Sequence, residues 1–237
     1  MRLPVAIRSP LARLRRTVCE QMGSARYSRP ALNDLDRKLE RYLDFDGGFF
    51  IEAGANDGVR QSNTYYFEKI RGWNGLLIEP VTALAAECRK NRRARVLQAA
   101  LVAKEEPGST VELHFAGLMS TVTNALGDAQ ATAQHVQVGL KVQQLSDTYR
   151  LQVPARTLSS LIDETRITRT IDLLCLDVEG AECAALRGID FARHAPRFIC
   201  VEVRDRTAIA GLLEPRYALR EALTDLGTHR DLLYVLR

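Results

Sequence analysis

The chain has 237 residues, of which 46% are hydrophobic and 26% charged, and its formal net charge is +4. This length suits one well-buried α/β domain, and the composition is that of a soluble globular protein. No apolar run approaches the roughly 18–20 residues needed to cross a bilayer. The five cysteines form no C-x-x-C pair. The sequence therefore excludes a membrane-spanning protein and a disulfide- or zinc-based scaffold, and it indicates a cytoplasmic protein with reduced thiols.

Residues 1–30 form a basic leader with seven arginines and a single acid, Glu20. Arginines interrupt every apolar stretch in it, so we do not expect a secretory signal. A solvated, partly disordered segment is the simpler interpretation. The alternative is an arm that makes weak contact with an anionic membrane or a polyanionic substrate.

From residue 31 onward the pattern predicts a single domain of alternating helices and strands. A helix is expected over 33–43, where Leu35, Leu39 and Tyr42 recur at helical spacing. Strands are expected at residues 48–53, 75–79, 95–101, 110–115, 171–178 and 197–203, and further helices at 63–70, 82–90, 157–164 and 181–186. Near-continuous apolar strands separated by helices indicate a parallel sheet covered on both faces, which is a doubly wound α/β fold.

Two later segments depart from this alternation. The stretches "RYALREAL" and "DLLYVLR" are separated only by "TDLGTHR" and predict a closing antiparallel hairpin. Residues 116–150 are rich in Gln, Thr, Ser and Ala and have a weak pattern. A connection of this length is typical of a lid, a binding loop or a mobile insertion.

The stretch "FFIEAGANDG" places a glycine turn directly after a buried strand. Gly54 and Gly58 allow sharp backbone turning and close approach of a ligand. The spacing does not match the G-x-G-x-x-G of dinucleotide sites, and a pyrophosphate would meet the carboxylates of Glu52 and Asp57. S-adenosylmethionine carries a sulfonium and an ammonium and tolerates nearby acids, so it fits this turn better.

The next strand ends on a carboxylate, Glu79, about twenty residues after the turn. Acids in this position accept hydrogen bonds from ribose hydroxyls in nucleotide-binding folds. In an open parallel sheet, ligands lie beyond the carboxyl ends of the strands, so the turn and Glu79 are expected at one crevice.

These pieces, in their order, resemble the FkbM-type methyltransferases, a branch of the class I S-adenosylmethionine-dependent fold. The resemblance covers about residues 48–237 and is carried by "FFIEAGANDG", "SNTYYFEK", "WNGLLIEP", "VLQAALVA", "ARTLSSLID", "IDLLCLDVEGAECAALRGID" and "PRFICVEV". It implies a Rossmann-like, seven-stranded, mostly parallel sheet with an antiparallel last strand. It also implies methyl transfer, usually to a hydroxyl oxygen of a sugar, glycan or natural product.

The resemblance also assigns the cofactor residues. Glu52 stands where the family often has Asp, and residues 116–150 fit the family pattern poorly, so no substrate residues carry over there. The expected residues are Glu52, Gly54, Ala55, Asn56, Gly58, Asn63, Glu79, Pro80, Gln98, Ala99 and Asp177.

The stretch "LDVEGAE" is a second group of acids. Alternation would put Asp177 and Glu179 on one side of an extended segment, and Glu202 ends a strand on the same rim. A hydroxyl acceptor needs a general base, which a desolvated carboxylate beside a second acid can supply, so these three are the catalytic candidates. Two of them could instead cap the following helix. The three together could also hold a divalent cation, although none is expected.

Two other functions stay open at this stage. The basic leader favours a nucleic-acid methyltransferase, but "DVEG" lacks the (Asp/Asn)-Pro-Pro-aromatic pattern of base methylation, and nucleic acid is not the expected partner. A non-catalytic binding module with the same fold is the second alternative. His135 in the insertion is weighed as a base and not adopted, and His229 is given no role. The oligomeric state and the acceptor are not determined.

Overall fold

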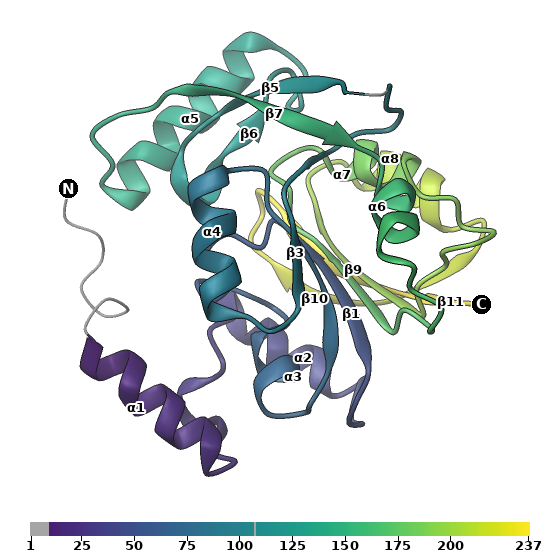
Figure 1. Ribbon diagram of the computed structural model, residues 1–237. Coiled ribbons are helices and arrows are strands. Elements are labelled where there is room, and N and C mark those ends of the chain that lie inside the picture. Colours follow the sequence, from purple (N-terminus) through teal and green to yellow (C-terminus); the bar gives the residue numbers. More distant parts are fainter. Residues whose placement is uncertain (1–9, 107) are drawn as a thin grey trace.

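The computed structural model describes residues 10–106 and 108–237. It has one large sheet and one small one (Figure 1). The large sheet has the strand order β10-β11-β9-β8-β1-β2-β3. Its members are β1 (Phe49–Ala53), β2 (Asn74–Ile78), β3 (Arg95–Leu97), β8 (Leu173–Leu176), β9 (Phe198–Val203), β10 (Tyr217–Asp225) and β11 (Arg230–Leu236).

The strand directions confirm the fold class expected from the sequence. Strands β1, β2, β3, β8 and β9 pair in parallel, whereas β11 is antiparallel to both β9 and β10. The predicted closing hairpin is therefore present, and its second strand is inserted between β9 and β10. The sheet is seven-stranded and mostly parallel, with an antiparallel last strand.

Alternation along the strands builds a hydrophobic core on each face of the large sheet. Phe49 and Ile51 of β1 pack with Leu76 of β2 in the first core, which also receives α6 (Leu158–Thr165), α7 (Glu182–Arg187) and α8 (Arg206–Leu213). Phe50 and Leu77 point to the opposite face and pack with α2 (Leu35–Glu40), α3 (Tyr65–Lys69) and α4 (Thr82–Asn91). Burial on both faces explains why the strand sequences are apolar throughout.

The predicted first helix is shorter than its apolar spacing suggests. Residues 32–34 form the 3-10 turn η3 (Leu32–Asp34), and α2 begins only at Leu35. Asn33 and Asp34 have φ of 53° and 55°, in the left-handed region, which ends any regular helix there.

The small sheet corrects the interpretation of residues 95–115. Its order is β4-β7-β5-β6, formed by β4 (Ala100–Leu101), β5 (Thr110–His114), β6 (Thr121–Val122) and β7 (Arg150–Arg156). The expected strand over 95–101 is split between the two sheets, because β4 leaves the edge strand β3 and pairs with β7. The run 110–115 belongs to the small sheet entirely. Apolar content predicted these strands but not which sheet they join.

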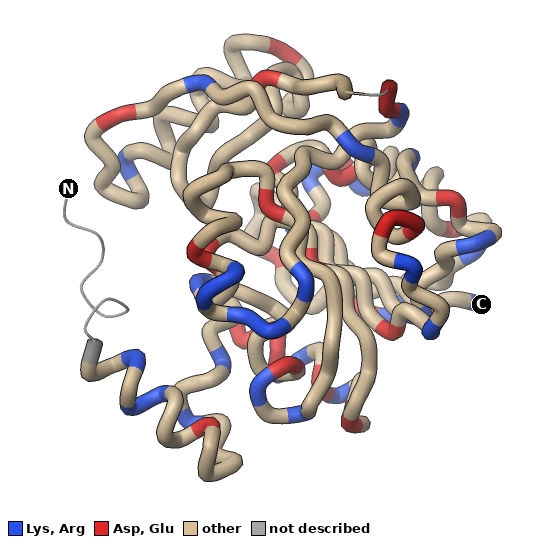
Figure 2. Tube along the Cα trace, viewed as in Figure 1, with Lys and Arg blue, Asp and Glu red and all other residues tan. Residues whose placement is uncertain are grey.

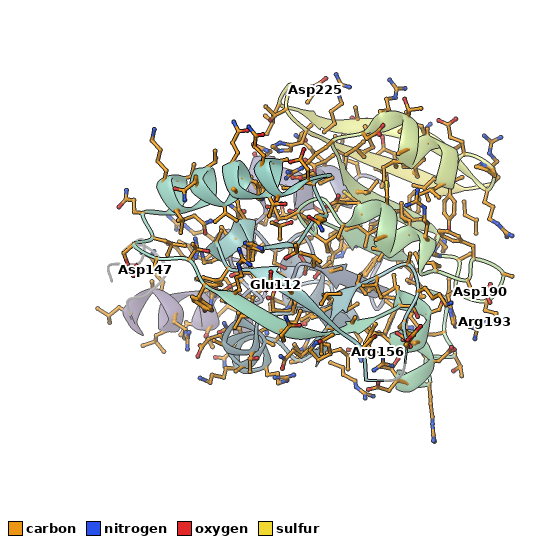
Figure 3. The ribbon with its side chains drawn as sticks, turned by 90° about the horizontal axis from the view of Figure 1, so that it is seen from above. Glu112, Asp147, Arg156, Asp190, Arg193 and Asp225 are labelled. Atoms are coloured by element: carbon orange, nitrogen blue, oxygen red, sulfur yellow. The ribbon has the colours of Figure 1, made fainter. Side chains whose placement is uncertain are left out.

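The insertion over 116–150 is largely regular structure. It contains the 3-10 turn η4 (Gly117–Met119), strand β6 and the helix α5 (Ala129–Gln143), whose first turn is capped by the Asp128 side chain. Only Thr132, Val136 and Gly139 of α5 are buried, so the apolar stripe is too narrow to predict a helix. Seen from above, α5 and the small sheet lie over the end of the large sheet (Figure 3).

Part of the basic leader has regular structure. Arg2 and Arg8 lie outside the described residues, but α1 (Pro10–Gln21) is a regular helix followed by the 3-10 turn η2 (Ala25–Tyr27). Glu20 accepts a hydrogen bond from Ser28 Oγ at 2.7 Å, which ties the helix to the segment after it. Within the described ranges no helix has the length and apolarity to span a membrane.

Candidate active site

The glycine turn after β1 is required by the fold itself. Gly54 has a φ of +86°, and a Cβ atom there would lie 1.9 Å from the carbonyl oxygen of Asp177, after β8. Gly58 has a φ of +80°, and its Cβ would lie 2.8 Å from Cys88 Sγ of α4. Gly54 thus lets the segments after β1 and β8 approach closely, and Gly58 lets the turn pack against α4.

Glu52 organises the loop that follows this turn. Its buried carboxylate accepts hydrogen bonds from Ser62 Oγ at 2.9 Å, from the Asn63 amide at 2.8 Å and from Thr64 Oγ1 at 2.5 Å. The guanidinium of Arg92 lies 3.5 Å away. Most of its acceptor capacity is taken by the protein, so Glu52 holds Asn63 in place.

Asn63 is buried, and its Oδ1 atom has no hydrogen-bond partner. A buried acceptor without a partner costs free energy, and it marks a place where a donor from a ligand would be stabilised. The residue lines the cavity described below.

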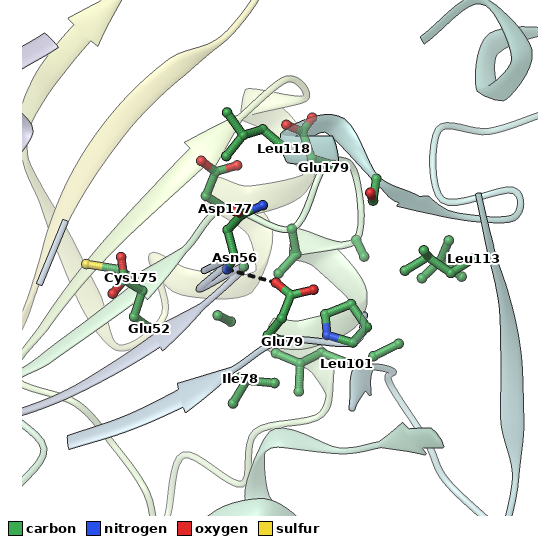
Figure 4. Close-up of a pocket in the computed structure, with 18 of the residues that line it drawn as sticks. Glu52, Asn56, Ile78, Glu79, Leu101, Leu113, Leu118, Cys175, Asp177 and Glu179 are labelled. Carbon is green, nitrogen blue, oxygen red and sulfur yellow. Dashed lines mark hydrogen bonds between the residues drawn. The ribbon is translucent and has the colours of Figure 1, made fainter. Parts of the chain in front are cut away.

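Glu79 lies at the end of β2 with its carboxylate directed at the same turn (Figure 4). One oxygen accepts from the Asn56 amide at 2.8 Å, and the other from the Val81 amide at 2.8 Å. Burial raises the pKa of Glu79 to about 7. Each carboxylate oxygen keeps a second lone pair, so two further hydroxyl donors can bind.

The acids of the second group meet beyond β8 and β9. Asp177 is surrounded by protein, although its side chain is exposed to a cavity. Desolvation by the surrounding protein is the largest cause of a pKa raised well above the usual range, and the charges of Glu202 and Glu179 raise this pKa further. Arg204 donates one Nη2 to both neighbours, at 2.6 Å to Glu179 and 2.8 Å to Glu202. One guanidinium therefore pairs with two acids and balances only one of their two charges, and Asp177 is not among its partners.

The turn that carries Glu179 is held from both sides. Glu179 has a φ of +52°, an unfavourable backbone conformation for a residue with a side chain. The buried carboxylate of Glu182 accepts from the amides of Val178 at 3.0 Å and Gly180 at 3.2 Å. Thr121 Oγ1 of β6 donates to the Glu179 carbonyl at 2.7 Å. These contacts fix the direction of the Glu179 side chain.

Two cavities meet at this point. The first extends from the glycine turn to the small sheet and is bounded by Asn63, Glu79 and Leu101. The second lies between α5 and the ends of β9 and β11, and its wall includes His135, Arg204 and His229. The residues that line both are Gln61, Leu118, Asp177 and Glu179. Figure 4 shows Asp177, Glu179 and Leu118 gathered at one end of the first cavity.

The structure brings most of the predicted cofactor residues together. The ones that line the first cavity are Glu52, Gly54, Asn56, Asn63, Glu79, Pro80, Ala99 and Asp177. Three do not: Ala55 and Gly58 are buried in the packing of the turn, and Gln98 donates to Thr82 Oγ1 at 2.8 Å. Direct contact with a cofactor stays a prediction from the resemblance for all eleven residues.

Sequence reasoning missed several residues of the two cavities. Arg60 and Gln61 follow the glycine turn and line the first cavity. His135, which was not adopted, has Nε2 at 3.2 Å from Glu179 Oε2, although the geometry is not that of a hydrogen bond. His229, given no role, has Nε2 at 3.6 Å from Glu202 Oε2. Arg204 could have been predicted, because it is a basic residue two positions after Glu202. The sequence around the two histidines has no comparable feature.

The alternative metal set is not assembled. In the part of the chain that the structure describes, no group of three or more His, Cys, Asp and Glu side chains is arranged to hold a metal ion. The Arg204 guanidinium lies between Glu179 and Glu202, where such a cation would have to bind.

This strand order is that of the Rossmann-like class I methyltransferases. The cavity at the carboxyl ends of the central strands, with the acid Glu79 after β2, agrees with it. The family profile described as methyltransferase FkbM domain matches residues 52–231. The chain therefore belongs to the FkbM methyltransferase family, as the sequence resemblance predicted, and is an S-adenosylmethionine-dependent methyltransferase.

Comparison with solved structures shows only a distant similarity of fold. A search of curated protein sequences finds no match. A TehB-like methyltransferase from Corynebacterium glutamicum is similar, with 13% identity, 95% of this chain and 96% of that chain covered, and a TM-score of 0.44. The delta-N METTL16 methyltransferase domain has 11% identity, coverage of 99% and 100%, and a TM-score of 0.47. These values are too low to transfer an activity.

Proposed function

We propose that this protein transfers a methyl group from S-adenosylmethionine to a hydroxyl oxygen of a small molecule or glycan. The observation that carries the proposal is the position of Asp177, whose carboxylate lines both cavities at their common boundary. A donor in the first cavity and an acceptor in the second would meet at this side chain.

The first cavity fits S-adenosylmethionine in three places. The orphaned Oδ1 of Asn63 would accept from the ammonium of its methionine part. The half-buried Arg60 would pair with the carboxylate of the same part. Glu79, with one lone pair left on each oxygen, would accept from both ribose hydroxyls.

Asp177 is the proposed general base. When bound, S-adenosylmethionine supplies an electrophilic methyl group. The acceptor hydroxyl is a weak nucleophile at neutral pH, and Asp177 would take its proton as the oxygen–carbon bond forms. The carbon–sulfur bond of the donor would break in the same step, with S-adenosylhomocysteine as the leaving group. The raised pKa of this carboxyl suits that step, since a more basic carboxylate binds the proton better. Arg204 pairs with Glu179 and Glu202 instead, which leaves Asp177 free to act.

The second cavity favours an acceptor that is uncharged near the reacting oxygen and partly apolar. Asp177, Glu179 and Glu202 lie together there with the single guanidinium of Arg204. A phosphate-rich backbone would be repelled by this group of acids. Apolar side chains complete the wall: Leu32, Leu118, Met119, Val138 and Val142. This supports a hydroxylated small molecule or glycan over nucleic acid.

The substitution Asp177→Asn tests the role of the base. We expect it to leave S-adenosylhomocysteine affinity within about threefold in calorimetry, and to lower methyl transfer about 10²–10⁴-fold, the usual contribution of a general base. Transfer would be measured with labelled donor against a library of hydroxylated acceptors.

Asp147→Asn is the matched control, because Asp147 is an exposed acid outside both cavities. It should bind and transfer like the original protein. An Asp177→Asn variant of normal activity would rule out the assignment of the base. Binding of the demethylated cofactor without transfer to any hydroxyl would favour a non-catalytic module.

A further inference from the structure

Helix α1 carries a stripe of apolar side chains that faces away from the protein. Leu11, Leu14, Val18 and Met22 recur at intervals of three and four residues, which places them on one face. Their exposed fractions are 76%, 60%, 45% and 79%. Four of the ten large apolar side chains exposed in the described ranges thus lie on this helix and the turn that follows it.

The opposite, polar face holds α1 to the domain. The guanidinium of Arg16 lies over the Tyr65 ring of α3, with 5.2 Å between its central carbon and the ring centre. Glu20 accepts from Ser28 Oγ and lies 3.9 Å from Arg16 Nε. A surface helix normally buries its apolar face and exposes its polar one. In α1 the polar face contacts the domain and the apolar face is exposed, so the apolar stripe is accessible to a partner.

The charges beside the stripe indicate which partner. Arg13 and Arg15 are exposed on the same helix, and Arg15 lies over the Tyr27 ring at 4.2 Å. Residues 10–30 contain five arginines and only one acid, and Figure 2 shows basic positions along α1. An apolar stripe with Arg15 at its edge, on a helix of positive net charge, complements the acyl boundary and the anionic headgroups of a bilayer. A second copy of the same surface would bring arginines against arginines.

We propose that α1 lies in the interface of an anionic lipid bilayer and holds the enzyme at the membrane surface. The apolar stripe enters the headgroup boundary while Arg15, at the edge of the stripe, pairs with lipid phosphates, and Arg13 adds positive charge to the same helix. This binding requires no catalytic turnover, so its test is independent of the acceptor chemistry proposed above.

The test is co-sedimentation of the full chain with vesicles. Mixed phosphatidylglycerol–phosphatidylcholine vesicles should bind the protein, and pure phosphatidylcholine vesicles should bind it weakly. The double substitution Leu14→Glu, Val18→Glu should lower the affinity at least about tenfold, because it places charges in the acyl boundary. Arg13→Glu, Arg15→Glu should also weaken binding and reduce its dependence on salt.

Leu226→Glu is the matched control, because Leu226 is 50% exposed in the turn between β10 and β11, away from α1. It should bind vesicles like the original chain. Thermal melting checks that each variant is folded. If the Leu14→Glu, Val18→Glu variant does not fold, the Arg13→Glu, Arg15→Glu variant provides the test. The proposal fails if the original chain does not bind anionic vesicles, or if both double variants bind them as tightly as the original chain does. It fails too if equilibrium sedimentation shows that the stripe only joins two copies of the chain.

Discussion

Two glutamates at the ends of neighbouring strands have different tasks because their neighbours differ. Glu52 accepts hydrogen bonds from three consecutive residues, 62–64, and lies beside a buried guanidinium. Glu79 accepts only two backbone amides. The first carboxylate is used to shape a loop, whereas the second retains acceptor capacity that faces the cavity. The residue type is the same, and the donors within reach decide the role.

Substitution of Glu79 tests the ribose assignment. Glu79→Ala should weaken S-adenosylhomocysteine binding by about one to two orders of magnitude, the scale of a lost hydrogen bond to a charged group. In the original protein the affinity should also rise with pH through about 7, because hydroxyl donors bind the ionised carboxylate better than the protonated one. Calorimetry at several pH values measures both effects.

Glu87→Ala is the control, since Glu87 is half-exposed on α4 and pairs with Lys90. It should change neither the affinity nor its pH profile. Unaltered affinity in Glu79→Ala would remove the ribose role. A pH dependence that persists in Glu79→Gln would place the titrating group elsewhere.

At the scale of elements, the small sheet completes the site. Thr121 of β6 is buried and donates to the carbonyl of Glu179, in the turn between β8 and α7. Glu182, the first residue of α7, binds the same turn through two amides. The insertion is therefore joined by a specific hydrogen bond to the turn that carries Glu179.

The hydroxyl of Thr121 should matter for both stability and transfer. Thr121→Val keeps the shape but leaves the partly buried Glu179 carbonyl without this donor, at a cost of about 1–3 kcal/mol. We expect an unfolding free energy lower by that amount and slower methyl transfer, measured by denaturant titration and the labelled-donor assay.

Thr121→Ser retains the hydroxyl and should behave much more like the original protein in both measurements. Equal effects of the two substitutions would mean that methyl packing, and not the hydrogen bond, is what counts at this position.

Across the whole molecule, the acids of the site oppose the stability of the fold. Burial raises the pKa of Glu79 and of Glu182 to about 7, from 4.5. A group whose pKa is raised on folding contributes full stability below its unfolded pKa, and that stability is lost as pH rises through the folded value. A ligand that binds the ionised form of such an acid recovers part of this cost.

The ligand-free protein should accordingly melt at a lower temperature near pH 8 than near pH 5. Each of the two acids can contribute up to about 3 kcal/mol to this difference, since one pKa unit is 1.36 kcal/mol. The double substitution Glu79→Gln, Glu182→Gln should flatten the dependence, and Glu87→Gln should not. A melting temperature that rises steadily from pH 5 to pH 8 would contradict the expected sign.

Much of the fold and part of the site followed from the sequence alone. The apolar runs and the short turn in the terminal hairpin determined the large sheet, because strands buried on both faces must be apolar throughout. The turn around Gly54 and the acid Glu79 are local signals, each readable within a few residues. They indicated the cofactor site because both follow the carboxyl ends of adjacent strands.

Only the tertiary structure decided what depends on residues far apart in the chain. Arg204 pairs with Glu179 across 25 residues, and His135 of α5 lies close to the same acid. The outward face of α1 is another such feature, because its periodicity predicts a helix with two faces, but not which face packs on the domain. Local spacing determines periodicity, whereas contacts between distant segments determine which side is buried and which charges meet.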